Sequence, residues 1–270
     1  MRPPRLPADT RGDLVRAAVI GALAGFLSGL FGVGGGILIV PGLVLIAHMD
    51  QRLAHGTSLA AIVPIAAAGV IGYLIDDKVD GAAALCITLG AMLGALAGTK
   101  ALQVLPARTL RLAFALILLL TAARLFLHEG DPAGRGALDP AMVVGFFALG
   151  LASGALSGLL GVGGGIIMVP VMVLGFGIPS VVAKGTSLLV IIPTSLVGTW
   201  RNLRNGNARI DLALAVGVAG TLTAFAGARV SIVMSDVLSA VLFGLLLVFS
   251  AARLLLTDRR ERRGSREAGG

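Results

Sequence analysis

The sequence predicts an all-α membrane protein built from two copies of one structural unit. Of its 270 residues, 56% are apolar and only 13% are charged, whereas soluble domains carry roughly 25% charged residues. Its apolar runs are long enough to cross a hydrocarbon core of about 30 Å, which takes roughly 20 helical residues. A glycine-rich block at 29–37 returns at 158–166, an offset of 129 residues. Self-similarity of this kind marks a structural repeat.

The apolar runs define the expected helices in order. We expect membrane segments at 14–31, 54–75, 81–102, 110–127, 140–160, 184–200, 211–228 and 237–256. Two shorter runs, 37–47 and 166–176, directly follow the glycine blocks. At about 1.5 Å rise per residue, each short run reaches only halfway across a bilayer.

The repeat sets the domain organisation, because residues match at the same offset throughout both copies. We expect one membrane domain with these parts: an N-terminal tail 1–13, repeat 1 at 14–127, a linker 128–139, repeat 2 at 140–256 and a basic tail 257–270. The linker is a long polar interruption rich in Gly and Pro, which is typical of a joint. The basic start followed by an apolar run also fits a signal peptide. Its counterpart, 141–160, lies deep inside the chain, so we assign the first segment to the fold.

Loop charges separate two arrangements of each glycine-broken helix pair. With both tails cytoplasmic and each pair a hairpin that returns to its starting side, the loops divide Lys and Arg seven inside to five outside. A single crossing by each pair divides them six to six. The positive-inside rule therefore favours hairpins, and with them two repeats inverted relative to each other. We expect the arginine-rich C-terminal tail to be disordered at the cytoplasmic surface.

Aromatic residues and evenly spaced glycines have expected structural roles. Tyr73 and Trp200 are the only Tyr and Trp, and each stands at the far end of a segment, where such residues anchor to lipid headgroups. Glycines at four-residue spacing bring helices close together. We expect this packing role for Gly21, Gly25, Gly29, Gly90, Gly94, Gly98, Gly150, Gly154 and Gly158.

The glycine blocks are the candidate binding site. A run of three glycines stops a helix, and backbone freed at membrane depth must be buried in protein or line a watery cavity. Half-helices beginning near Gly36 and Gly165 direct their positive ends at the break, where an anion binds. The alternative is close helix packing through small residues. The candidate substrate-binding glycines are Gly34, Gly35, Gly36, Gly163, Gly164 and Gly165.

Hydroxyl and cationic residues follow each block at the same offset. Thr57 and Ser58 match Thr186 and Ser187 at the expected start of a membrane helix. There they either cap early N–H groups or donate to the oxygens of an anion.

Immediately before these pairs stand His55 and Lys184, the repeat position where both copies offer a potentially cationic group. Lys184 either extends to the membrane interface or turns inward and supplies charge for an anion. We include both residues among the candidate substrate-binding residues.

The residues that are missing exclude several function classes. All 14 acidic residues lie in tails, loops or near segment ends, which disfavours cation binding at the midplane. With three His and one Cys, no nucleophile and base pair is evident, so we expect no enzyme activity, no cofactor and no metal site. The loop lacks the P-loop lysine and the third glycine of a dinucleotide fingerprint. Positive charge in tails and loops indicates contact with the lipid bilayer and not with nucleic acid.

In these residues the chain resembles the TauE/SafE sulfite exporter group, also called the toluene sulfonate uptake permeases. The resemblance lies in Gly-x-Phe-Gly-Val-Gly-Gly-Gly-x-x-x-x-Pro at 29–41, repeated at 158–170 with Leu160 in place of Phe. Each block is followed by Ala-x-Gly-Thr-Ser-Leu, at 54–59 and 183–188. Through its motif, Phe31 joins the candidate substrate-binding residues. The resemblance implies a bacterial inner-membrane permease for sulfite, sulfonates or related organosulfur anions.

We therefore expect a secondary transporter for a small anion, with its site between the two glycine loops and the two Gly-Thr-Ser segments. Its expected partners are the anion, the bilayer and, in a homodimer, a second copy of the chain. An anion or solute channel is the alternative, because paired half-helices in inverted repeats serve both functions. A membrane scaffold without transport is a further alternative.

Overall fold

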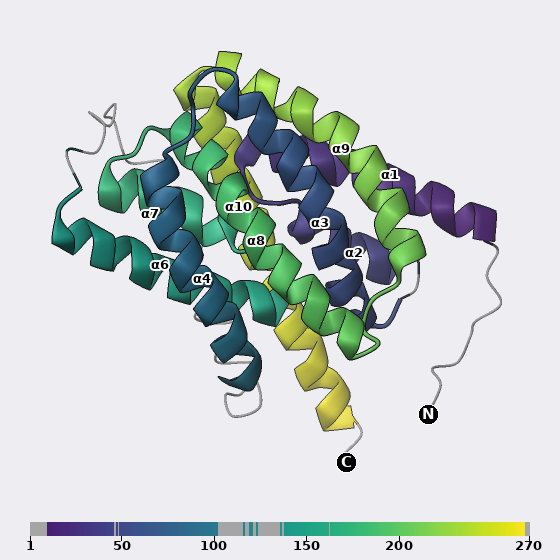
Figure 1. Ribbon diagram of the computed structural model, residues 1–270. Coiled ribbons are helices and arrows are strands. Elements are labelled where there is room, and N and C mark those ends of the chain that lie inside the picture. The colour runs from purple at the N-terminus through teal and green to yellow at the C-terminus, as the bar shows by residue number, and fades with distance from the viewer. Residues whose placement is uncertain are drawn as a thin grey trace.

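The computed structural model describes residues 10–101 except 46 and 48, residues 138–267 except 162, and the isolated residues 116, 119, 120, 123 and 136. Regular structure in this part of the chain is helical (Figure 1), which confirms the all-α prediction. The helices are α1 (Thr10–Phe31), α2 (Gly36–Leu45), α3 (Gln51–Leu74), α4 (Gly81–Ala101), α6 (Pro140–Leu160), α7 (Gly165–Phe176), α8 (Ser180–Arg204), α9 (Ile210–Val233) and α10 (Asp236–Glu267). Most of the segment expected at 110–127 and most of the linker lie outside the described residues.

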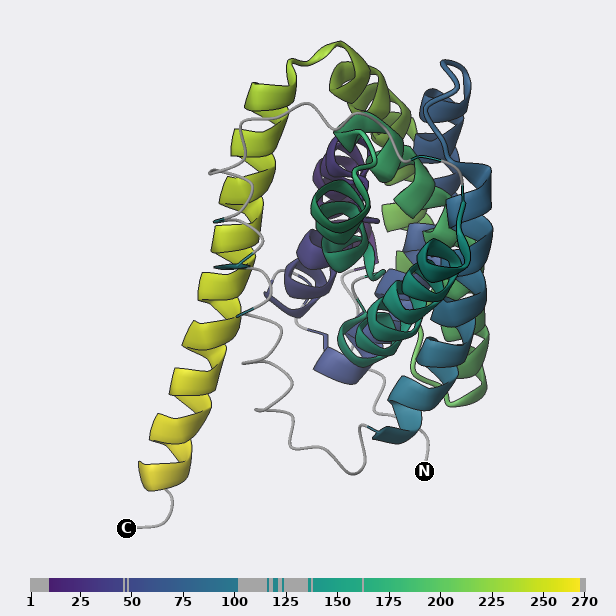
Figure 2. The same ribbon diagram turned by 90° about the vertical axis from the view of Figure 1, so that its left-hand side faces the viewer.

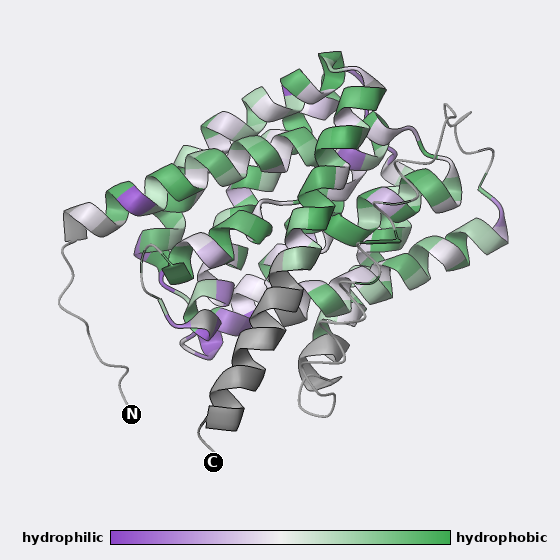
Figure 3. Ribbon diagram, turned by 180° about the vertical axis from the view of Figure 1, so that it is seen from behind, coloured by the Kyte–Doolittle hydropathy of each residue, from purple (hydrophilic) through white to green (hydrophobic). Residues whose placement is uncertain are grey.

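Five of the described helices, α1, α3, α6, α8 and α9, are long and apolar enough to cross a membrane. Figure 3 shows that most residues along the described helices are apolar. Large side chains among them point outward, including Leu23 at 62% and Leu222 at 75% exposure. Such a surface is stable only against lipid or another apolar partner, so the chain is a multi-pass membrane protein.

The C-terminal tail differs from its prediction. We expected disorder from residue 257 onward, but α10 continues as a helix to Glu267. Arg and Glu are good helix formers, and the arginine run adds turns to a helix that the preceding apolar residues have already begun.

Among the described residues, α1–α4 of the first repeat correspond to α6–α9 of the second, and helices of one repeat pack against helices of the other. Helix α1 packs along α9, which belongs to the other repeat, and α6 packs along α4. The closeness of the helices is seen by adding a Cβ atom to a glycine. A Cβ added to Gly21 would overlap the carbonyl oxygen of Val216. A Cβ added to Gly150 would overlap the carbonyl oxygen of Ile87, which is the residue equivalent to Val216. The same close approach confirms the packing role of Gly25, Gly29, Gly90, Gly94 and Gly154.

Helices α3 and α8 are equivalent in the two repeats and cross in opposite directions at the centre of the bundle. A Cβ at Gly56, near the start of α3, would lie 3.0 Å from Cβ of Asn202, near the end of α8. Reciprocally, a Cβ at Gly185 would lie 2.9 Å from Cβ of Tyr73, near the end of α3. The pair is therefore antiparallel. Which ends face the cytoplasm stays a prediction from the loop charges.

Each short helix folds back along the helix that precedes it. In the first repeat, a Cβ at Gly42 of α2 would lie 2.8 Å from Cγ2 of Ile20 on α1. In the second, a Cβ at Gly145 of α6 would lie 2.8 Å from the ring of Phe176, the last residue of α7. The glycine breaks are thus the tips of two helical hairpins.

The two expected headgroup anchors have different environments. Tyr73 is fully buried, and its hydroxyl donates to the carbonyl oxygen of Gly29 at 2.7 Å. The anchoring role predicted for Tyr73 is therefore wrong, because its ring packs on Gly185, where the opposite helix leaves space. Trp200 is 53% exposed, and the guanidinium carbon of Arg204 lies 4.1 Å from its ring centroid. Anchoring by Trp200 stays a prediction.

Candidate functional site

The glycine breaks have the same unusual backbone conformation in both repeats. Their left-handed φ angles are 70° at Gly32, 82° at Gly34, 76° at Gly35, 65° at Gly161, 86° at Gly163 and 74° at Gly164. Residues with a Cβ rarely adopt such angles. The shared conformation explains why three glycines recur at equivalent positions. Helix packing alone would require small residues there but not positive φ angles. The half-helices begin at Gly36 and Gly165, as predicted.

The two breaks meet inside the bundle. A Cβ at Gly163 would lie 3.5 Å from the carbonyl oxygen of Val33 and 3.9 Å from Cα of Gly34. A Cβ at Gly165 would lie 2.6 Å from the carbonyl oxygen of Gly32. The fold therefore brings together the candidate glycines that are 129 residues apart in the sequence.

Serine hydroxyls join the breaks across the repeats. Ser187 Oγ donates to the carbonyl oxygen of Gly32 at 2.8 Å, and Ser58 Oγ donates to that of Gly161 at 3.2 Å. Both serines are fully buried. Each repeat thus supplies the hydroxyl that holds the break of the other.

Threonine hydroxyls hold the turns that connect the long helices. Thr57 Oγ1 accepts from the backbone N–H of Arg209 at 3.0 Å, and Thr186 Oγ1 accepts from that of Asp80 at 2.9 Å. We considered capping of the threonines' own helices, and the structure corrects that alternative. Helices α3 and α8 begin at Gln51 and Ser180, so the hydroxyls lie inside the helices.

Several backbone N–H groups at each break have no hydrogen-bond acceptor among the described residues. Leu38 and Ile39 donate to the carbonyl oxygen of Gly35, but the amides of residues 33–37 have no acceptor among the described residues. The amides of 163–166 likewise have none in this part of the chain. Unpaired N–H groups at the N-terminus of a helix form a site for an anion, since the helix dipole adds to their partial charges.

Lys184 and His55 lie beside the two breaks. Lys184 is fully buried, and a Cβ at Gly32 would lie 2.6 Å from its Cα. Its ammonium donates to Ser231 Oγ at 2.9 Å and to Ser239 Oγ, which connects α8 to α9 and α10. The side chain of Lys184 therefore turns inward and does not extend to the membrane interface, and its role in binding an anion stays a prediction.

His55 occupies the equivalent place at the other break, where a Cβ at Gly161 would lie 2.8 Å from its Nδ1. Unlike Lys184, His55 is only partly buried. The two breaks therefore share a backbone conformation but differ in the residue beside them, Lys184 at one and His55 at the other.

Phe31 is the last residue of α1, and its ring packs on another helix. It stacks on Phe243 of α10, with 5.5 Å between the ring centroids. Figure 2 shows α10 running along one side of the bundle. The motif singled out Phe31, but nothing in the sequence indicated that α10 is its neighbour.

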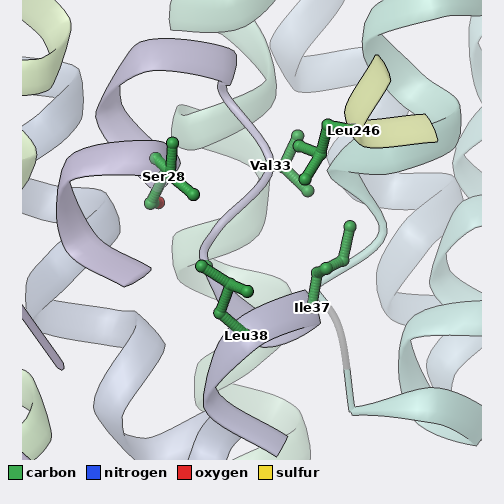
Figure 4. A pocket seen from close by; sticks show the side chains of 7 residues that line it. Ser28, Val33, Ile37, Leu38 and Leu246 are labelled. Carbon is green, nitrogen blue, oxygen red and sulfur yellow. The ribbon is translucent and has the colours of Figure 1, made fainter. Parts of the chain in front are cut away.

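A cavity of about 10 Å³ lies beside the first break. It is lined by Leu27, Ser28, Val33, Gly35, Ile37, Leu38 and Leu246 (Figure 4). A single water needs roughly 10–15 Å³ measured in this way, so this cavity is too small for an oxyanion. No oxyanion therefore fits in this pocket as the structure has it.

Comparison with known proteins gives a family and several relatives. A family profile described as "Sulfite exporter TauE/SafE" matches residues 2–125 and 146–269. The chain is 30% identical over 240 residues to the probable membrane transporter protein YdhB of Bacillus subtilis (strain 168), covering 84% of this chain and 97% of that protein. It is 29% identical over 227 residues to the probable membrane transporter protein YunE of the same organism, covering 76% and 83%. A probable membrane transporter protein of Xylella fastidiosa (strain Temecula1) is 29% identical over 204 residues, covering 74% and 78%.

Proposed function

Because the chain belongs to the TauE/SafE family of membrane transporters, we propose that it carries a small sulfur oxyanion or organosulfonate as a secondary transporter. The observation that carries this proposal is the meeting of two helix breaks whose backbone amides have no acceptor among the described residues. A sulfonate or sulfite group presents several oxygens, which matches donors that converge from two helix ends.

The charges around the breaks support an anion over a cation. The backbone and Cβ of Lys184 adjoin the first break, and His55 adjoins the second. The acidic side chains in described salt bridges, those of Asp76 and Asp211, pair with arginines and are partly exposed. Neither lies among the residues that contact the glycine loops. A cation at this place would meet the positive ends of two half-helices and would lie near the charged Lys184, which disfavours it.

The reciprocal contacts between the repeats fit alternating access in a transporter, the function that the relatives' names indicate. The glycine loops touch each other, and the adjoining cavity is too small for the substrate. Transport then requires a rearrangement, and two equivalent repeats provide two equivalent arrangements, one open to each side. Within this proposal the chain lies in a bacterial inner membrane with both termini in the cytoplasm.

Flux measurements in proteoliposomes test the proposal. We expect saturable uptake of sulfite or methanesulfonate, accumulated against its gradient when a proton or sodium gradient is imposed. Flux that only dissipates the anion's own gradient would identify a channel. Uptake of both anions no faster than into protein-free liposomes would contradict the proposed substrate class.

A further inference from the structure

Two isoleucines at equivalent repeat positions lie against the glycine loops. Ile62 of α3 and Ile191 of α8 are both fully buried. A Cβ at Gly34 would lie 3.1 Å from Cδ1 of Ile191 and 3.5 Å from Cγ2 of Ile62. A Cβ at Gly163 would lie 3.6 Å from Cγ2 of Ile191. Ile191 therefore touches both loops at the place where they meet.

The missing side chains of the loop glycines leave space that these isoleucines occupy. A methyl group added to Gly34 would lie only 3.1 Å from Cδ1 of Ile191. The Ile191 side chain would have to move by a few tenths of an ångström to make room for it. A substrate group that enters between the loops has to displace the same side chains. Aliphatic side chains cannot hydrogen-bond the anion, so their effect on the substrate is one of volume and apolar contact.

We propose that Ile62 and Ile191 form an apolar plug between the two glycine loops and determine the largest substituent that a transported anion can carry. This inference rests on the proposed function. It adds that specificity for small over bulky sulfonates comes from these two side chains, while the backbone amides bind the oxyanion group common to all of them.

The repeat supplies a matched control on the same two helices. Leu59 and Leu188 are also equivalent, buried and aliphatic. They pack on Gly198 and Gly69 of the opposite helix, at 2.9 Å and 2.8 Å from the position of a Cβ, and not on the loop glycines. Truncating them removes a similar apolar volume from α3 and α8 without opening the space between the loops.

The experiment compares transport of methanesulfonate and benzenesulfonate by the full chain in proteoliposomes. We expect the wild type to prefer methanesulfonate. In Ile191→Ala, the ratio of kcat/KM for benzenesulfonate to that for methanesulfonate should rise by about tenfold or more, the scale on which a pocket discriminates apolar groups. Ile191→Val should give a smaller rise, and Leu188→Ala none.

Two results would overturn the inference. One is an unchanged ratio in folded Ile62→Ala and Ile191→Ala. The other is a wild type that transports both sulfonates equally well. If Ile191→Ala does not fold, Ile191→Val decides, because it removes a single methyl group, and an unchanged ratio there counts against the plug. Failure of the proposed function has a different outcome, since the wild type would then transport neither sulfonate.

Discussion

The hydroxyl of Ser187 lies 2.8 Å from the carbonyl oxygen of Gly32, a residue 155 positions earlier in the chain. The hydrogen bond connects α8 of the second repeat to the helix break of the first. The equivalent bond from Ser58 to Gly161 does the reverse. The site is therefore assembled from both halves.

Ser187→Ala should destabilise the protein through this contact. The variant leaves a buried carbonyl of Gly32 without its donor, which costs about 1–3 kcal/mol. Thermal unfolding in detergent measures the effect. Ser250→Ala is the control, because Ser250 Oγ bonds within its own helix to Leu246 and should lower the Tm less. Equal losses in both variants would contradict a special role for the bond between the repeats.

Gly34→Ala should abolish transport while the protein stays folded. Gly34 has a φ of 82°, and its nearest neighbours are flexible isoleucine side chains, so the main cost is backbone strain of about 1–2 kcal/mol. The added methyl group also projects toward the isoleucines at the meeting point of the loops. Uptake of sulfite into proteoliposomes measures the loss.

The control for this variant is Gly206→Ala. Gly206 has a φ of 69°, and nothing lies within 4 Å of the position that the alanine methyl group would take, so the substitution imposes similar strain away from the loops. We expect full transport from it. If both variants lost transport equally, backbone strain would explain the effect, and the position of Gly34 between the loops would not.

The packing glycines should behave differently from the loop glycines. A Cβ at Gly90 would overlap the carbonyl oxygen of Phe147, so Gly90→Ala must push α4 away from α6. We expect a lower Tm and less folded protein, with an unchanged KM for sulfite in the molecules that remain folded. A raised KM with unchanged stability would place Gly90 in the site.

Lys184→Met should weaken anion binding. Met keeps much of the length and apolar volume but removes the charge, and a hydrogen bond to a charged group is worth about 1.5–3 kcal/mol. We therefore expect the KM for sulfite to rise about tenfold or more. Ser239→Ala, which removes a partner of the ammonium but keeps its charge, should change the KM less. An unchanged KM in a folded Lys184→Met would assign the lysine a purely structural role.

The inverted arrangement makes a prediction about topology. A reporter fused after residue 135 should read periplasmic, and fusions after 205 and at the C-terminus should read cytoplasmic. The physical reason is the excess of Lys and Arg in the loops assigned to the inside. A cytoplasmic signal at 135 would contradict the inverted arrangement.

Much of this arrangement could be predicted from the sequence, because hydropathy, repeat spacing and glycine runs act locally. The half-helix starts at Gly36 and Gly165 were predicted correctly for this reason. Contacts between distant residues could not be predicted, since apolar residues look alike in a membrane sequence. In the sequence, Ile62 and Ile191 cannot be told apart from the apolar residues around them. The sequence also did not indicate that Ser231 and Ser239 accept hydrogen bonds from Lys184. The environment of Tyr73 was predicted wrongly because the space that its ring occupies is left by Gly185, a residue of the other repeat.

Equilibrium binding of sulfite to the purified protein in detergent tests the central claim most directly, because binding does not depend on coupling or on direction of transport. The claim is that an anion binds to the backbone of the two glycine breaks. It predicts the same Kd for the wild type and Gly206→Ala, and no saturable binding to folded Gly34→Ala. Binding of sulfite to Gly34→Ala with the wild-type Kd would contradict it.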